Sequence, residues 1–129
     1  LVEADEAKTA KLQLSWVAEN AKDELRDLAR LRLAALLLDE KAFDQALKQL
    51  EGSVSPSFEL RFIELKGDIL SAQDKKSEAA GAYQSALGKL KDSGKTVGSE
   101  SASRGWQGQS SVIYQQLLQQ KLDALGGEQ

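Results

Sequence analysis

The sequence predicts an all-α fold, built as a short array of helical repeats, and two observations lead to this prediction. Alanine, leucine, glutamine, lysine and glutamate dominate the 129 residues, and only 5% of the residues are aromatic. Such a composition favours helices throughout. A pattern of small and apolar residues also recurs after thirty-three positions, where Ala34, Leu36, Leu37, Ala46 and Leu50 return as Gly67, Ile69, Leu70, Ala79 and Tyr83. A period of this length is typical of helical repeats, whose single units are too small to bury their own apolar faces.

The first helix is expected over about 5–21. Ala10, Leu14 and Val17 recur there at the three- and four-residue spacing that places side chains on one face of a helix. Trp16 lies close beside this face, and we expect its large apolar ring to belong to the core. This helix fits the second helix of an earlier, truncated repeat.

Three further helices are predicted before residue 73. The second, over about 24–39, is rich in leucine almost all round, which indicates a position between two neighbours. A short third helix covers about 43–51. The fourth runs over about 56–72, because Ser55 is a favourable N-cap and Pro56 is favoured at the first helical position, where its missing N–H needs no partner.

The C-terminal part begins with a fifth helix over about 77–90, whose inward face carries Ala79, Tyr83, Ala86 and Leu87. Residues 92–108 are rich in glycine and serine and lack an apolar period, so we predict a flexible linker. A sixth helix over about 109–125 is predicted to cap the exposed end of the array, as terminal repeats require; the alternative is that it docks on a partner. Its apolar stripe consists of Ile113, Tyr114, Leu117, Leu118, Lys121, Leu122 and Leu125.

The predicted organisation is therefore a set of helical repeats over 1–91, with the first unit truncated, a Gly/Ser-rich linker over 92–108 and an amphipathic capping region over 109–129. No stretch approaches the roughly 20 apolar residues of a membrane-spanning helix. The start is acidic, with neither a signal peptide nor an initiator Met. We therefore expect a piece of a longer protein, with any membrane anchor upstream.

Composition excludes several classes of function. The chain has no Cys and no His, which removes thiolate nucleophiles, imidazole acid–base catalysis and the common zinc sites. No pair of carboxyl groups lies in a context that would raise one pKa for acid–base work. The net charge is −3, and no basic stripe offers phosphate contacts to a nucleic acid. We therefore expect no enzymatic activity, no cofactor, no metal and no nucleic-acid partner.

The repeated positions resemble those of the tetratricopeptide repeat (TPR). In that family a small residue on the first helix of a unit meets a small residue on the second, so that the two helices pack closely. Gly67 and Ala79 are the corresponding pair in the second unit, and Ala34 and Ala46 in the first. The resemblance covers about residues 10–91 and departs from the repeat at Lys66, where a leucine is expected.

Longer stretches resemble the TPR-like ancillary subunits of the bacterial Sec translocon. They are the runs LQLSWVAENAKD at 12–23, LARLRLA at 28–34, ELKGDIL at 64–70 and AYQSAL at 82–87. The resemblance implies one membrane-spanning helix upstream and a TPR-like domain on the periplasmic side of the inner membrane. The implied partners are translocon subunits and a membrane-anchored periplasmic chaperone of the prolyl-isomerase type.

TPR arrays bind extended peptides or helices along a concave surface lined by the first helix of each unit, and this register gives the candidate site residues. The candidates for partner binding are Leu28, Leu31, Leu38, Arg61, Glu64, Asp68 and Ser71. Two alternatives remain open. The charged residues could instead pair with one another on a solvated helix face, and the leucines could be covered by the first and last helices.

Four other residues stand apart from this groove. Arg30 and Arg32 interrupt a leucine-rich helix, where they either hold a carboxylate of a partner or pair with nearby acids and reach water. Trp16 is assigned to the core, as stated above. Trp106 lies in the predicted linker, where it is either a local staple or an exposed anchor.

The function predicted from the sequence is that of a non-catalytic adaptor, which links the translocon to periplasmic chaperones or to emerging client segments. One alternative is a TPR-type scaffold in another envelope or cytoplasmic assembly. Another is a structural module that associates with itself as a homodimer through its terminal helices.

Overall fold

The computed structural model describes the backbone of residues 2–96 and 105–126 and the side chains of residues 5–92 and 112–126. The all-α fold predicted from the sequence is confirmed. In the described part of the chain the helices are α1 (Val2–Asn20), α2 (Asp23–Asp39), α3 (Phe43–Gln49), α4 (Pro56–Ala72), α5 (Lys76–Thr96) and α7 (Gly105–Gly126). None of the described helices is long and apolar enough to cross a membrane.

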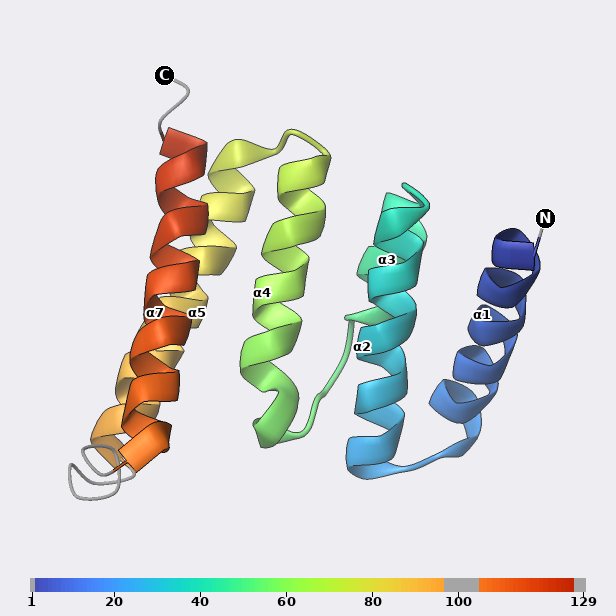
Figure 1. The fold of residues 1–129 in the computed structure, drawn as a ribbon, viewed down its shortest axis with the longest axis horizontal. Coiled ribbons are helices and arrows are strands. Elements are labelled where there is room, and N and C mark those ends of the chain that lie inside the picture. The colour runs from blue at the N-terminus through green and yellow to red at the C-terminus, as the bar shows by residue number, and fades with distance from the viewer. Residues whose placement is uncertain (1, 97–104, 127–129) are drawn as a thin grey trace.

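The helices form two layers (Figure 1). In this view α2, α4 and α7 stand in the near layer, with α3 behind α2 and α5 behind α7. Helix α1 closes one end of the array and packs on α2, whereas α7 closes the other end and packs on α5. The near layer thus holds the first helix of each unit, which is the layer expected to line a concave face.

The helix bounds agree with the prediction except around residues 92–108. Helix α5 continues to Thr96, and α7 begins at Gly105 rather than near residue 109. Leu90, at the predicted end of the helix, is buried against the core. Glycine and serine lower helix propensity by at most about 1 kcal/mol per residue and do not forbid a helix. Residues 97–104 lie outside the described part, so the predicted flexibility there stays a prediction.

The core consists of two clusters at the repeated positions. One joins α4, α5 and α7 through Leu70, Ala79, Tyr83, Ala86, Leu87, Leu90 and Leu118. The other joins α2, α3 and α4 through Leu33, Leu37, Ala46 and Ile69. The repeat therefore marks the residues that pack, as expected when neighbouring units supply each other's core.

Gly67 permits the close approach of α4 and α5. A Cβ atom built on Gly67 would lie 2.6 Å from Cε1 of Tyr83 and 2.9 Å from its Cδ1. Such distances are below van der Waals contact, so a larger residue would force the Tyr83 ring aside. The Tyr83 hydroxyl is also held, since it donates a hydrogen bond to Asp68 Oδ1 at 2.6 Å.

The prediction for Trp16 was wrong, because 65% of this residue is exposed. Leu14 belongs to the face of α1 that packs on the α2–α4 cluster. Trp16 follows two positions later, and at 100° per residue its side chain points to the opposite side of the helix. Trp106 lies outside the described side chains.

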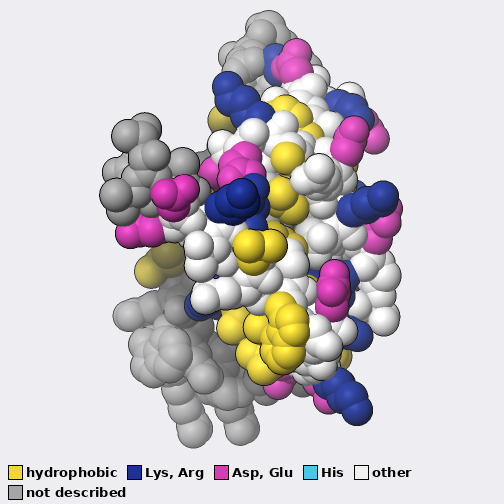
Figure 2. Space-filling view, turned by 90° about the vertical axis from the view of Figure 1, so that its right-hand side faces the viewer, with side chains coloured by type: hydrophobic (Ala, Val, Ile, Leu, Met, Phe, Trp, Pro, Cys, Tyr) yellow, Lys and Arg dark blue, Asp and Glu magenta, His cyan; other side chains and the backbone are white. Residues whose placement is uncertain are grey.

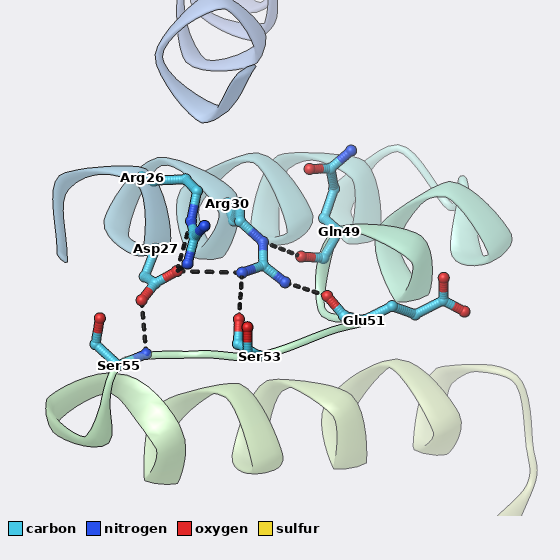
Figure 3. A network of polar contacts seen from close by, with 7 residues as sticks. All are labelled: Arg26, Asp27, Arg30, Gln49, Glu51, Ser53 and Ser55. Atoms are coloured by element: carbon cyan, nitrogen blue, oxygen red, sulfur yellow. Dashed lines mark hydrogen bonds and ion pairs between the residues drawn. The ribbon is translucent and has the colours of Figure 1, made fainter. Parts of the chain in front are cut away.

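A buried carboxylate joins α2 to the start of α4 (Figure 3). Asp27 is fully buried, and its Oδ2 accepts a hydrogen bond from the backbone N–H of Ser55 at 2.7 Å. Its Oδ1 lies 3.1 Å from Nη1 of Arg30 and 3.2 Å from Nη2 of Arg26. Burial by itself raises the pKa of the Asp27 carboxyl, but the hydrogen bonds from Ser55 and Arg26 outweigh it, so the pKa lies below its ordinary value.

Arg30 holds the connection between α3 and α4. Its Nε donates to the Gln49 carbonyl at 2.9 Å and its Nη1 to the Ser53 carbonyl at 3.0 Å, while Nη2 donates to the Glu51 carbonyl. The guanidinium also lies 5.0 Å from the centre of the Phe62 ring. Of the two interpretations of Arg30 from the sequence, pairing with a nearby acid is therefore the correct one.

We predict that Gly67→Ala lowers the free energy of unfolding by about 2 kcal/mol, because the new methyl group overpacks the contact with Tyr83. Gly81→Ala is the matched control, since nothing lies within 4 Å of a Cβ at that position. It should raise helix stability by up to about 1 kcal/mol. Urea unfolding followed by circular dichroism measures both, and equal effects of the two substitutions would contradict the close approach.

We predict that Asp27→Asn lowers the free energy of unfolding at pH 7 by about 3 kcal/mol, because Arg30 loses its buried partner charge. Asp44→Asn, at an exposed position of α3, should change it by less than about 0.5 kcal/mol.

The same pair of proteins tests the ionisation of Asp27. A carboxyl group whose pKa is lowered on folding stabilises the fold above its unfolded pKa, near 3.9, and loses this effect as the pH falls through the folded pKa. The difference between wild type and Asp27→Asn should therefore shrink below about pH 4. A constant difference from pH 7 to pH 2.5 would show that the charge of Asp27 is unimportant.

Candidate functional site

A groove opens between α2, α4 and α7, the three helices of the near layer in Figure 1. It encloses about 700 Å³. Its lining residues are Leu31, Arg32 and Ala35 of α2, Arg61, Glu64, Leu65 and Asp68 of α4, Leu90 of α5 and Tyr114 of α7. The groove therefore combines apolar walls with charged groups from two helices.

The structure brings together four of the seven candidate residues. Leu31, Arg61, Glu64 and Asp68 line the groove, whereas Leu28, Leu38 and Ser71 are absent from its lining. Leu38 packs instead against the core cluster that joins α2, α3 and α4. Ser71 sits in the last turn of α4, where its carbonyl accepts a hydrogen bond from the N–H of Asp74 at 2.9 Å.

Glu64 and Asp68 are bound to α7. Lys121 Nζ lies 2.7 Å from Glu64 Oε2 and 3.0 Å from Asp68 Oδ1. The Tyr114 hydroxyl donates to Glu64 Oε1 at 2.7 Å, and the Tyr83 hydroxyl donates to Asp68 as described above. The two carboxylates thus pair with residues of α7 and not with Arg61. This differs from the alternative given above, in which the charged residues of α4 pair with one another on a solvated helix face. The only local sign of this arrangement was a lysine inside the apolar stripe of α7.

The pKa values in this cluster reflect burial and the two carboxylates. Burial raises the pKa of Tyr83, and the hydrogen bond and charge of Asp68 raise it further. The pKa of Tyr114 is raised in the same way by burial and by Glu64. For Lys121, burial lowers the pKa, but the hydrogen bonds and charges of Glu64 and Asp68 outweigh it and raise the pKa overall. At neutral pH the two phenols therefore stay neutral and Lys121 stays an ammonium group.

Two guanidinium groups of the groove remain available. Arg32 and Arg61 are exposed, and neither forms a hydrogen bond or an ion pair with any residue whose side chain the structure describes. Arg32 was assigned from the sequence to a separate candidate pair rather than to the groove. A guanidinium binds a carboxylate through two parallel hydrogen bonds. Together with Leu31 and Leu65, these groups form a site suited to an apolar segment that carries acidic side chains.

Part of the predicted apolar stripe of α7 is exposed. Leu118 is fully buried, but Ile113 is 64% and Leu117 is 43% exposed. Leu117 lies three residues after Tyr114 and four before Lys121, and this spacing places it on the side of α7 that faces the groove. Neither Ile113 nor Leu117 is among the residues that line the groove, although the sequence analysis had placed both in the stripe of the helix that caps the array.

We predict that stability falls as the pH rises above about 10, because groups whose pKa is raised on folding stabilise the fold only while they are protonated. The contribution is complete below the unfolded pKa values, near 10, and is lost as the pH rises through the folded ones. Each such group adds a loss of about 1.4 kcal/mol per pH unit. Tyr114→Phe should therefore reduce the alkaline slope by about this amount in urea unfolding between pH 9 and pH 11.5. An unchanged slope would contradict the coupling to Glu64.

Known proteins agree with this architecture. The family model described as a tetratricopeptide repeat-like domain matches residues 1–127. The chain is 36% identical over 124 residues to a protein of Neisseria gonorrhoeae (strain ATCC 700825 / FA 1090) named ancillary SecYEG translocon subunit. The alignment covers 95% of this chain and 51% of the relative, so the chain spans about half the length of that protein. No solved structure matches the chain.

The match to the family model extends over almost the whole chain. It therefore includes α7 as well as the repeats between residues 10 and 91, to which the resemblance in the sequence was confined. The resemblance to ancillary subunits of the Sec translocon is also confirmed by the relative. The repeated core positions, the two layers and the close approach at Gly67 are the structural counterpart of this match, and the chain belongs to the tetratricopeptide repeat-like domain family.

Proposed function

We propose that this chain is a non-catalytic adaptor of the Sec translocon, which binds a segment of another protein in the groove between α2, α4 and α7. The observation that carries the proposal concerns Arg32 and Arg61, whose guanidinium groups pair with none of the side chains that the structure describes and are set among apolar side chains in a groove of about 700 Å³. The similarity to an ancillary SecYEG translocon subunit supports the choice of assembly.

The proposed location is the periplasmic side of the bacterial inner membrane, with the anchor outside these 129 residues. The proposed partners are translocon subunits, a periplasmic chaperone or an emerging client segment. These finer assignments rest on the resemblance of the sequence to the ancillary translocon subunits. The groove geometry supports a protein partner in each case.

The charges of the groove favour an acidic, amphipathic segment. Lys121 balances Glu64 and Asp68 only in part, but Arg32 and Arg61 add two further positive charges, so the five groups sum to +1. A carboxylate of the bound segment can therefore accept hydrogen bonds from Arg32 and Arg61, while Glu64 and Asp68 are already paired with Lys121. Leu31 and Leu65 offer apolar contact beside these donors, and such contact supplies affinity while the charges supply orientation.

The rival interpretation, a scaffold in another envelope or cytoplasmic assembly, shares this groove and differs in the partner. Capture from membranes separates the two interpretations. The purified chain is immobilised and incubated with detergent-solubilised inner membranes, and the bound proteins are identified by mass spectrometry. Recovery of translocon subunits supports the proposal. Recovery of a different assembly alone would refute the translocon assignment and leave the groove intact.

We predict that Arg32→Glu together with Arg61→Glu reduces this capture about 100-fold, because two charged hydrogen-bond donors, each worth roughly 1.5 kcal/mol, are lost. The matched control is Lys66→Glu with Lys75→Glu, which makes the same change of charge at exposed positions outside the groove lining. Capture by the control should equal that of wild type. Equal losses in both double variants would exclude the groove as the binding site.

A further inference from the structure

Arg61 has an acidic neighbour on its own helix and does not pair with it. Glu64 follows Arg61 by three positions in α4, and residues at this spacing are neighbours on a helix surface, where opposite charges attract. Arg61 nevertheless forms no ion pair or hydrogen bond with any residue whose side chain the structure describes. The reason must lie in the other groups that contact Glu64.

Opposite charges do lie side by side elsewhere on the surface. Figure 2 looks onto the end of the array formed by α1, whose outer face carries the exposed residues Leu12 and Trp16. In this view basic and acidic side chains lie next to one another on both sides of a row of hydrophobic side chains. Lys11 Nζ of α1, for example, lies 2.7 Å from Glu40 Oε1. Among the described side chains, the lack of such a pair at Arg61 is therefore a particular feature of the groove.

All four carboxylate oxygens of Glu64 and Asp68 already have donors from other helices. The two oxygens of Glu64 accept hydrogen bonds from the Tyr114 hydroxyl and from Lys121 Nζ, each at 2.7 Å. Asp68 Oδ1 accepts a hydrogen bond from the Tyr83 hydroxyl at 2.6 Å, and Lys121 Nζ lies 3.0 Å from Oδ1 and 3.2 Å from Oδ2. Lys121 is the one cation among these three donors, so the positive charge bound to the two carboxylates comes from α7.

Lys121 influences the groove from outside it. It is not among the described residues that line the groove, whereas Arg61, Glu64 and Asp68 are. Its side chain is 28% exposed, and its ammonium group lies 5.7 Å from the centre of the Tyr83 ring. Ion pairs that are partly shielded from water are stronger than exposed ones. Glu64 therefore pairs with the half-buried Lys121 in preference to the exposed Arg61.

We propose that Lys121 is a positioning residue for the ligand of the groove, because its ion pair with Glu64 keeps the Arg61 guanidinium available to a carboxylate of the bound segment. This inference rests on the proposed function of the groove. If the charge of Lys121 is removed, Glu64 carries an uncompensated charge one turn from Arg61, and the two residues pair along α4. Arg61 must then leave Glu64 before it can bind an acidic segment, and the affinity for that segment falls.

The net charge of the groove changes together with the pairing of Arg61. The cations Arg32, Arg61 and Lys121 and the carboxylates Glu64 and Asp68 sum to +1. Removal of the charge of Lys121 lowers this sum to zero, and additional removal of the charge of Glu64 returns it to +1. The second change also removes the acid that would pair with Arg61. A single and a double variant can therefore separate the effect on Arg61 from any loss of structure.

Fluorescence anisotropy tests the inference on the whole 129-residue chain, with a labelled amphipathic peptide of leucine and glutamate as the probe. Lys121→Met keeps the apolar stem of the side chain and should weaken binding about tenfold, because one charged hydrogen-bond donor is withdrawn from the ligand. Lys66→Met is the matched control, since Lys66 is exposed on α4 outside the groove lining, and it should bind like wild type. Circular dichroism checks that each variant is folded, which the fully buried Leu118 of α7 leads us to expect.

A double variant distinguishes the positioning role from a structural one. Lys121→Met together with Glu64→Gln should bind the peptide within about twofold of wild type, because Arg61 is available again and the net charge is restored. If Lys121 served only to hold α7 in place, this variant would bind no better than Lys121→Met, since it also lacks the ion pair. That result, or wild-type affinity in Lys121→Met, would overturn the inference.

Arg61→Gln gives an independent measure of the coupling. It should weaken peptide binding about tenfold in wild type but less than about twofold in Lys121→Met, where Glu64 already holds the guanidinium. Equal losses in the two backgrounds would refute the inference and leave the proposed function of the groove standing. If the wild-type chain does not bind the peptide, or binds it equally well after Arg32→Glu with Arg61→Glu, the proposed function fails and the inference fails with it.

Discussion

The buried Asp27 carboxylate and the adjacent Arg30 guanidinium form the constraint on which the arrangement of the two repeats depends. The segment between α3 and α4 has no regular secondary structure, so its carbonyl and N–H groups need partners from elsewhere. Arg30 donates to two of these carbonyls, those of Glu51 and Ser53, and to the carbonyl of Gln49 at the end of α3, while Asp27 accepts the N–H of Ser55. Two apolar side chains of similar volume would bury as much surface but would leave these backbone groups unsatisfied. The ion pair therefore sets the spacing between α2 and α4, and with it the width of the groove.

Ion pairs also hold the junction between α4 and α7, but with different consequences for the groove. Glu64 and Asp68 lie on the groove side of α4, and α7 docks there because Lys121 and Tyr114 supply the cation and the hydroxyl that the carboxylates require. The acids of α4 are thereby used to hold a helix. The groups left to contact a partner are Arg32, Arg61 and the apolar side chains that line the groove. The net positive charge of the groove thus follows from the way in which α7 is attached to α4.

The sequence predicted the fold well and the candidate site in part. Small and apolar residues such as Ala46 and Ala79 repeat because each unit packs on its neighbour in the same way, so a period visible in the sequence identifies the core. Lys121 is 57 residues from Glu64, and no local pattern connects two such positions. The exposure of Trp16, which was assigned to the core, and that of Leu117 were missed for a related reason. An amphipathic pattern shows which residues are apolar, but it does not show how much of that stripe a neighbouring helix covers.

A repeat array also separates its functions in space. Helix α1 packs on α2, and none of the residues that line the groove belongs to α1. The groove depends on α2, α4 and α7, whose spacing is fixed by ion pairs at both junctions. The outer face of α1 depends on a few exposed residues of one helix, and these can change without loss of the core. Residues on the outer face of α1 can therefore vary without changing the lining of the groove.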